Sequence, residues 1–121
     1  MYEITKDFAF SAAHVLHGLR PNHPCGRTHG HNYTVRVALS AHDLNTVGFV
    51  VDYGDLKPFG LWLDTNLDHQ LLNKVLPMQP SAENMAQYLH AVLHDVVPVP
   101  DGVTVAVAVS ETPKTWAWYR P

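Results

Sequence analysis

Two histidines stand one residue apart in the segment CGRTHGH, residues 25–31, which also holds the only cysteine of the chain. Side chains alternate between the two faces of a strand, so His29 and His31 point the same way if this segment is extended. A third histidine, His14, ends the upstream segment FSAAH. Three imidazoles and one open position are typical of catalytic zinc, and the pattern therefore predicts a metal centre. The alternative is a set of strand histidines that only form hydrogen bonds.

Cys25 lies four residues before His29, in a loop rich in glycine and proline. A thiolate is favoured beside a bound cation, which makes this cysteine a candidate acid/base group or nucleophile. Two alternatives stay open from the residues alone. The thiol is either buried and inert, as is common for a lone cysteine, or it is a fourth metal ligand that closes the open position.

Composition indicates one folded domain, residues 1–121, and excludes several classes of function. Hydrophobic residues make up 46% of the chain and charged residues 16%, and the net charge of −3 gives no basic surface for nucleic acid. No apolar run approaches the roughly 20 residues that span a membrane. Charges within the first seven residues argue against a signal peptide, and a lone cysteine forms no internal disulfide. We therefore expect a cytoplasmic protein.

Hydrophobic alternation predicts four strands, at residues 2–10, 31–41, 103–110 and 115–120. Residues 11–28 are predicted to form a loop. Asp52 and Ser81 are suitable N-caps for two intervening helices. The resulting order, ββααββ, predicts an α+β fold in which two helices cover one face of an antiparallel sheet. Such a sheet has two open edges, and assembly of subunits into a ring would pair them.

Two further features concern polar side chains on regular elements. Glu111 continues the parity of the valines at 103–109, so it points toward the buried face unless a bulge intervenes. A carboxylate there is costly unless it binds something. His90 and His94 lie four residues apart on the second helix with no third ligand evident, and we expect both to face solvent.

Six short motifs resemble, in sequence and in order along the chain, those of the tunnelling-fold pterin enzymes. These enzymes form the 6-pyruvoyltetrahydropterin and 6-carboxytetrahydropterin synthase superfamily. The motifs are FSAAH (10–14), CxxxHGHNY (25–33), GFVVDY (48–53), LDH (67–69), PSAEN (80–84) and SET (110–112). The three-residue gap between Cys25 and His29 resembles the carboxytetrahydropterin branch, because the pyruvoyl branch usually carries a longer gap.

The resemblance implies that three subunits close one barrel and that two barrels stack into a hexamer with active sites between subunits. It implies roles for seven residues in a site for pterin: zinc ligation by three, proton transfer and its support by three, and anchoring of the pterin ring by one. These are, in that order, His14, His29 and His31; Cys25, His69 and its orienting partner Asp68; and Glu111. Arg27, Lys57 and Lys114 are candidate partners for a substrate triphosphate, although each is equally an ordinary surface charge.

The resemblance also implies a reaction. We expect a zinc-dependent lyase that converts 7,8-dihydroneopterin triphosphate to 6-carboxy-5,6,7,8-tetrahydropterin, acetaldehyde and triphosphate, on the way to 7-deazaguanine compounds such as queuosine. One alternative is 6-pyruvoyltetrahydropterin synthase activity, which removes triphosphate without breaking a carbon–carbon bond. The others are a non-catalytic zinc- and pterin-binding relative and a structural zinc protein.

Overall fold

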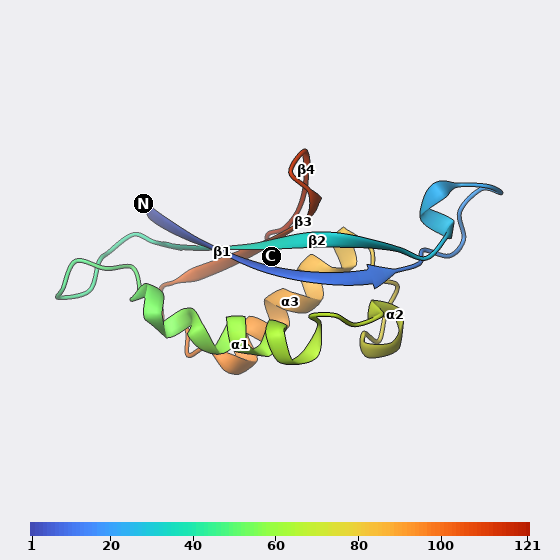
Figure 1. Cartoon of the computed structure of the whole chain (residues 1–121). Coiled ribbons are helices and arrows are strands. Elements are labelled where there is room, and N and C mark those ends of the chain that lie inside the picture. Colours follow the sequence, from blue (N-terminus) through green and yellow to red (C-terminus); the bar gives the residue numbers. More distant parts are fainter.

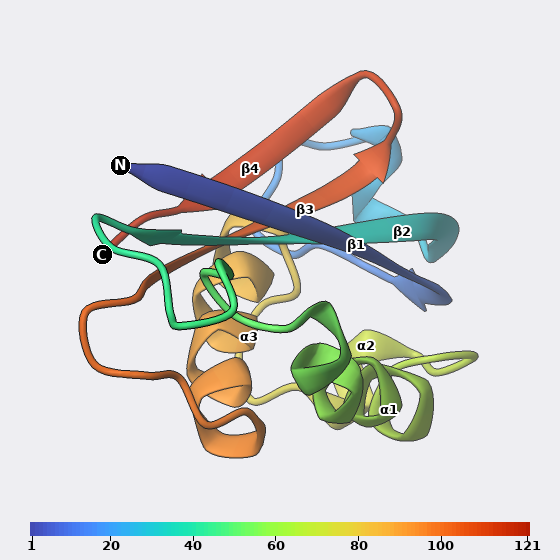
Figure 2. The same ribbon diagram turned by 90° about the vertical axis from the view of Figure 1, so that its left-hand side faces the viewer.

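A computed structural model describes residues 1–121 and contains one antiparallel sheet of four strands in the order β1-β2-β3-β4. The strands are β1 (Tyr2–His14), β2 (His29–Ala41), β3 (Thr104–Thr112) and β4 (Thr115–Tyr119). The helices are α1 (Lys57–Asn66), α2 (Leu72–Val75) and α3 (Ala82–Val96), with short 3₁₀ helices at Pro24–Gly26 and Tyr53–Leu56. All three α-helices lie on one face of the sheet (Figures 1 and 2), which confirms the predicted α+β class and, apart from the additional short helix α2, the ββααββ order.

The core fills the space between this face and the helices, and the alternation of the strands explains its composition. Val35, Val37 and Leu39 of β2 are buried, and β3 contributes its own alternate valines. From the helices come mainly Phe59 and Leu63 of α1 and Met85, Leu89 and Leu93 of α3. Burying one such side chain fully contributes about 1.5–3 kcal/mol, so this packing is what holds the helices against the sheet. No helix is both long enough and apolar enough to cross a bilayer.

The first strand is longer than predicted, and this difference creates the site. Residues 11–14 were expected to begin a loop, but β1 continues to His14 and β2 begins at His29, where the two residues pair directly. The segment 69–71 runs parallel beside the outer edge of β1, where the Ala13 N–H donates to the Gln70 carbonyl at 3.0 Å. The loop prediction for 11–14 was therefore wrong, because pairing on both sides holds short side chains in an extended strand.

Both predicted helix caps are found, one of them on a different element. Ser81 Oγ accepts a hydrogen bond from the Asn84 N–H at 3.2 Å and begins α3 as expected. Asp52 Oδ1 accepts from the Gly54 N–H at 2.8 Å, but it caps the 3₁₀ helix Tyr53–Leu56 that leads into α1. The short α2 was not predicted, and it follows directly after the segment 69–71 that lies beside the edge of β1.

Candidate metal centre and active site

Three histidine side chains converge where β1 ends and β2 begins. His14 pairs directly with His29 in the ladder, and His31 follows two residues later, so all three lie on the helix-facing side of the sheet. Their potential ligand nitrogens all lie within 4.8 Å of one another. His14 is fully buried, while His29 and His31 are half-buried. The predicted convergence of these three side chains is confirmed, and the cluster can hold a metal ion.

Backbone carbonyls set the orientation of two of the rings. His14 Nδ1–H donates to the Pro80 carbonyl at 2.7 Å, and His29 Nδ1–H donates to the Arg27 carbonyl at 2.6 Å. A carbonyl only accepts, so the proton of each neutral ring is on Nδ1 and the lone pair is on Nε2. The two Nε2 atoms lie 2.9 Å apart. Two lone pairs at this distance repel each other unless a cation lies beside both, and the donor set therefore fits a metal that prefers imidazole.

Glu111 brings a carboxylate to the same cluster from the end of β3. Its Oε2 lies 3.3 Å from His14 Nε2 and 3.5 Å from His31 Nε2. The β3–β4 pairing shifts between Val109 and Thr112, but the side chain still lies on the helix-facing side with the histidines. Burial lowers the pKa of His31, as do His14 and His29, and Glu111 opposes this in part. The shift favours the neutral ring, which is the form that ligates a metal.

Asp68 and His69 form a pair beside β1. The Ser11 N–H donates to Asp68 Oδ1 at 2.9 Å, and His69 Nδ1–H donates to Asp68 Oδ2 at 2.7 Å. These two bonds, with the Ser11 contribution the larger, hold the pKa of Asp68 below its usual range. His69 has a left-handed backbone, with φ of 59°, and its side chain is 83% exposed. Its Nε2 forms no hydrogen bond within the chain.

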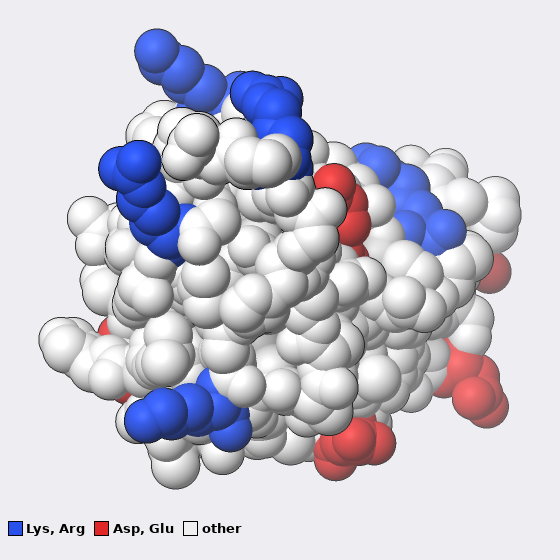
Figure 3. Space-filling model, turned by 90° about the vertical axis from the view of Figure 1, so that its right-hand side faces the viewer, with Lys and Arg blue, Asp and Glu red and all other residues white.

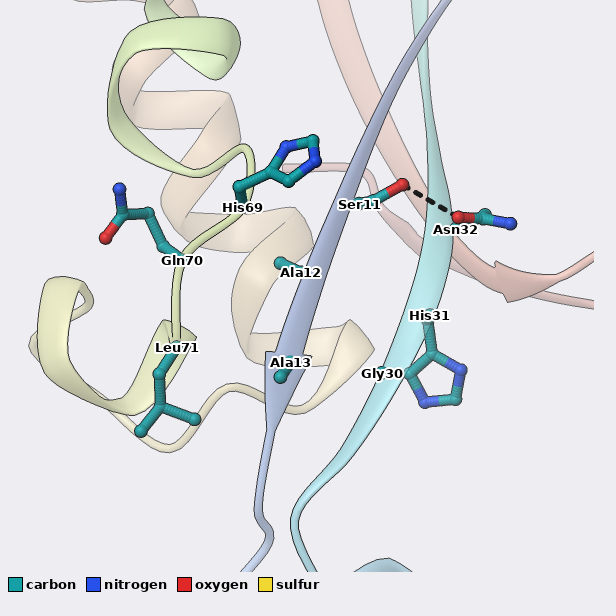
Figure 4. A pocket seen from close by; sticks show the side chains of 9 residues that line it. All are labelled: Ser11, Ala12, Ala13, Gly30, His31, Asn32, His69, Gln70 and Leu71. Atoms are coloured by element: carbon teal, nitrogen blue, oxygen red, sulfur yellow. Dashed lines mark hydrogen bonds between the residues drawn. The ribbon is translucent and has the colours of Figure 1, made fainter.

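His69 and His31 both line an open depression of about 520 Å³ at the edge of β1. Figure 4 shows His31 projecting from β2 and His69 lying on the other side of β1, near Ser11. Ser11 Oγ donates to Asn32 Oδ1 at 2.7 Å across the two strands. The sequence motifs contained Ser11 and Asn32, but no role was predicted for either. The depression is large enough to admit part of a small molecule.

Cys25 is not part of the histidine cluster. It lies in the 3₁₀ turn Pro24–Gly26, where its N–H donates to His23 Nδ1 at 3.0 Å and its carbonyl accepts from the Leu16 N–H at 3.0 Å. The thiol is half-buried in the loop that projects beyond β1 and β2 in Figure 1. Within this chain the cluster therefore gains no ligand from Cys25.

The candidate phosphate partners are ordinary exposed cations in the single chain. Arg27, Lys57 and Lys114 are all exposed and none forms an ion pair. On the side of the molecule seen in Figure 3, Lys and Arg side chains lie around the margin of a largely uncharged surface, with two of them next to each other at the top.

The two carbonyls that orient the rings, from Arg27 and Pro80, are the functional groups that sequence reasoning missed. Every residue carries such a carbonyl, so no side-chain signal marks them. Tyr33 was also missed. It is buried beside the histidines with no partner for its hydroxyl, and burial followed by the charge of Glu111 raises its pKa.

Comparison with known proteins agrees with this geometry. The model of the family described as 6-pyruvoyl tetrahydropterin synthase matches residues 3–121. The 6-carboxy-5,6,7,8-tetrahydropterin synthase of Bacillus subtilis is 32% identical, over 99% of this chain and 86% of that protein. The 6-pyruvoyl tetrahydrobiopterin synthase of Poecilia reticulata is 31% identical, over 97% of this chain and 88% of that protein.

Among solved structures, the 6-pyruvoyl tetrahydropterin synthase of Caenorhabditis elegans superposes with a TM-score of 0.85 at 31% identity, covering 99% of this chain and 95% of that one. The likeness confirms the predicted tunnelling fold of the subunit. The fold, the order of motifs and the matches across nearly the whole chain agree. The chain therefore belongs to the 6-pyruvoyl tetrahydropterin synthase family.

Proposed function

We propose that this protein is a zinc-dependent 6-carboxytetrahydropterin synthase of the cytoplasm. It converts 7,8-dihydroneopterin triphosphate to 6-carboxy-5,6,7,8-tetrahydropterin, acetaldehyde and triphosphate, a step toward 7-deazaguanine compounds such as queuosine. The observation that carries the proposal is the convergence of His14, His29 and His31, with two rings oriented by backbone carbonyls. The Bacillus subtilis relative, whose name states this product, supports the choice of reaction.

The site residues divide the chemistry between them. Zinc held by the three histidines would supply a Lewis acid that polarises the hydroxyl oxygens of the substrate side chain. Cys25 is the general base toward that side chain. His69 transfers a proton through its exposed Nε2, and Asp68 holds the opposite nitrogen and so selects the tautomer. Glu111 accepts paired hydrogen bonds from the amine and the N–H of the pterin ring.

The complete site needs more than one subunit. We propose a hexamer of two stacked three-subunit barrels, in which β1 and β4 are the edge strands that pair with neighbours. The strongly exposed side chain of His69 supports this arrangement, because a group that serves a neighbouring subunit's site is exposed in the single chain. Exposed Arg27, Lys57 and Lys114 are available to contact triphosphate once subunits meet.

A second candidate is 6-pyruvoyltetrahydropterin synthase activity, favoured by the names of the Poecilia and Caenorhabditis relatives. The same residues would act on the same substrate, but the carbon–carbon bond of the side chain would stay intact. The short Cys25–His29 spacing favours the carboxytetrahydropterin product instead.

The test is to incubate the zinc-loaded protein with 7,8-dihydroneopterin triphosphate and to identify the products by mass spectrometry. We expect 6-carboxytetrahydropterin together with acetaldehyde. Pyruvoyltetrahydropterin without acetaldehyde would replace the first candidate by the second. No conversion by protein with a full complement of zinc would contradict both, and it would leave a non-catalytic pterin-binding protein.

A further inference from the structure

We infer that Glu111 is the fourth metal ligand in the substrate-free protein, so that the open position of the three-histidine centre is closed until substrate arrives. The inference rests on the metal centre of the proposed function. It assigns to Glu111 the fourth-ligand role that the sequence left open for Cys25, which lies outside the cluster.

Two distances from Glu111 match those between neighbouring ligands of one metal ion. Four atoms about 2.0–2.1 Å from a tetrahedral zinc ion lie about 3.3 Å from one another. Glu111 Oε2 is 3.3 Å from His14 Nε2 and 3.5 Å from His31 Nε2. The carboxylate oxygen thus lies where a fourth vertex is expected relative to two of the three nitrogens.

The chemistry of these contacts points the same way. An ionised carboxylate only accepts hydrogen bonds, and the proton of His14 is on Nδ1, where it is donated to Pro80. His14 Nε2 therefore presents a lone pair both to Glu111 and to His29 Nε2, which is 2.9 Å away. A single bridging proton relieves only one of these contacts, since it lies on one line between two atoms. One metal ion among the four side chains relieves all of them.

The surroundings strengthen a bond between a carboxylate and a cation. Glu111 is only 27% exposed, and the inner side of the cluster is closed by Tyr33, whose ring is 5.9 Å from that of His14 and 5.4 Å from that of His31. Charges attract more strongly in such a setting than in water. When the substrate side chain takes the position, the released carboxylate becomes free to bind the pterin ring, as proposed above.

The test uses cobalt(II), whose visible bands report its ligands, in the assembled protein without any pterin. Spectra and cobalt affinities, the latter from competition with a chromophoric chelator, are compared for the wild type, Glu111→Gln and Glu111→Ala. Glu83→Ala is the matched control, because Glu83 is exposed on the first turn of α3 and lines the same surface depression as Glu111. Circular dichroism confirms that each variant is folded, and the glutamine variant preserves the side-chain shape.

We expect the bands of both Glu111 variants to shift in position and intensity, and their cobalt affinity to fall by at least about tenfold. The Glu83 variant should match the wild type in both measurements. Unchanged bands and affinity in Glu111→Gln would overturn the inference while leaving the three-histidine centre and the proposed reaction intact. Failure of the wild type to bind cobalt would overturn the inference and the proposed metal centre together.

Discussion

The chain has two groups of neighbouring histidines, and their rings are equally close. In the cluster at the β1–β2 end, ring centroids lie 4.5–5.1 Å apart. On α3, the rings of His90 and His94 lie 4.7 Å apart. His94 is exposed as predicted, but His90 is half-buried and packs 5.2 Å from the ring of Tyr119, so the expectation that both face solvent was wrong for His90.

The two groups of histidines differ in the other side chains that lie close enough to bind a metal ion. The α3 pair has no third metal-ligating side chain beside it, whereas the β1–β2 cluster has three imidazoles, two of them oriented by carbonyls, and a carboxylate. A helix brings residues four apart together through local geometry alone. The cluster instead needs strand pairing and a loop that returns to the strand end. An arrangement that depends on such distant segments is typical of a functional site.

The largest expected effect is loss of the metal. His31→Ala should reduce bound metal well below one ion per chain and abolish turnover, because it removes one of the three imidazole ligands and leaves a weaker, altered donor set. His94→Ala, the matched change in the other pair, should leave metal content and turnover unchanged. Inductively coupled plasma mass spectrometry of the folded proteins measures both. Equal metal content in the two variants would contradict the assignment of the metal to the β1–β2 cluster.

The next effect separates proton transfer from metal binding. His69→Asn should lower kcat by about 10²–10⁴-fold with metal content unchanged, since a general acid/base group contributes on this scale. Asparagine is chosen because it tolerates the left-handed backbone at this position better than most residues. Steady-state kinetics alongside metal analysis gives the result, and a parallel loss of metal would mean that His69 supports the centre instead.

Cys25→Ala should behave in the same way, with a loss of turnover near 10²-fold, the low end of that range. We expect zinc content and the oligomeric state to be preserved, because the thiol is not part of the histidine cluster. Size-exclusion chromatography and metal analysis accompany the kinetics. Zinc loss in this variant would make Cys25 a ligand in the assembled protein.

The smallest effect concerns stability and the α3 pair. Burial first, and then the charge of His94, lower the pKa of His90 in the folded protein. Below the unfolded pKa of about 6.5, the unfolded chain takes up a proton that the folded chain resists, so stability falls as the pH drops. His90→Gln should lose less stability than the wild type between pH 7.5 and 5.5 in urea unfolding. His42→Gln, at an exposed histidine, should lose as much stability as the wild type over the same pH range. If His90→Gln also lost as much as the wild type, the lowered pKa assigned to His90 would be contradicted.

Much of this molecule could be predicted because the signals are local. Alternation placed Val35, Val37 and Leu39 in the core, and Ser81 marked the start of α3. The convergence of the three histidines followed from spacing and resemblance together. The core positions and the helix start depend on residue type and on near neighbours, which a sequence displays.

The features that the sequence did not predict are those that depend on contacts between distant segments. Ser11, Ala12 and Ala13 have side chains too short to indicate a strand, and only the pairing of residues 11–14 with 29–32 and the contact with 69–71 make this segment one. The carbonyls that orient His14 and His29 have no sequence signature. The contact of Glu111 with His14 joins residues 97 positions apart. The position of Glu111 in the strand alternation predicted the buried face, but it did not predict that His14 would lie beside the carboxylate.

The most direct test of the metal centre is anomalous X-ray scattering from crystals of the protein, recorded on both sides of the zinc absorption edge. We expect one strong peak per chain, within bonding distance of His14, His29 and His31, and none beside His90 and His94. A peak at the α3 pair with none among the three histidines would contradict it.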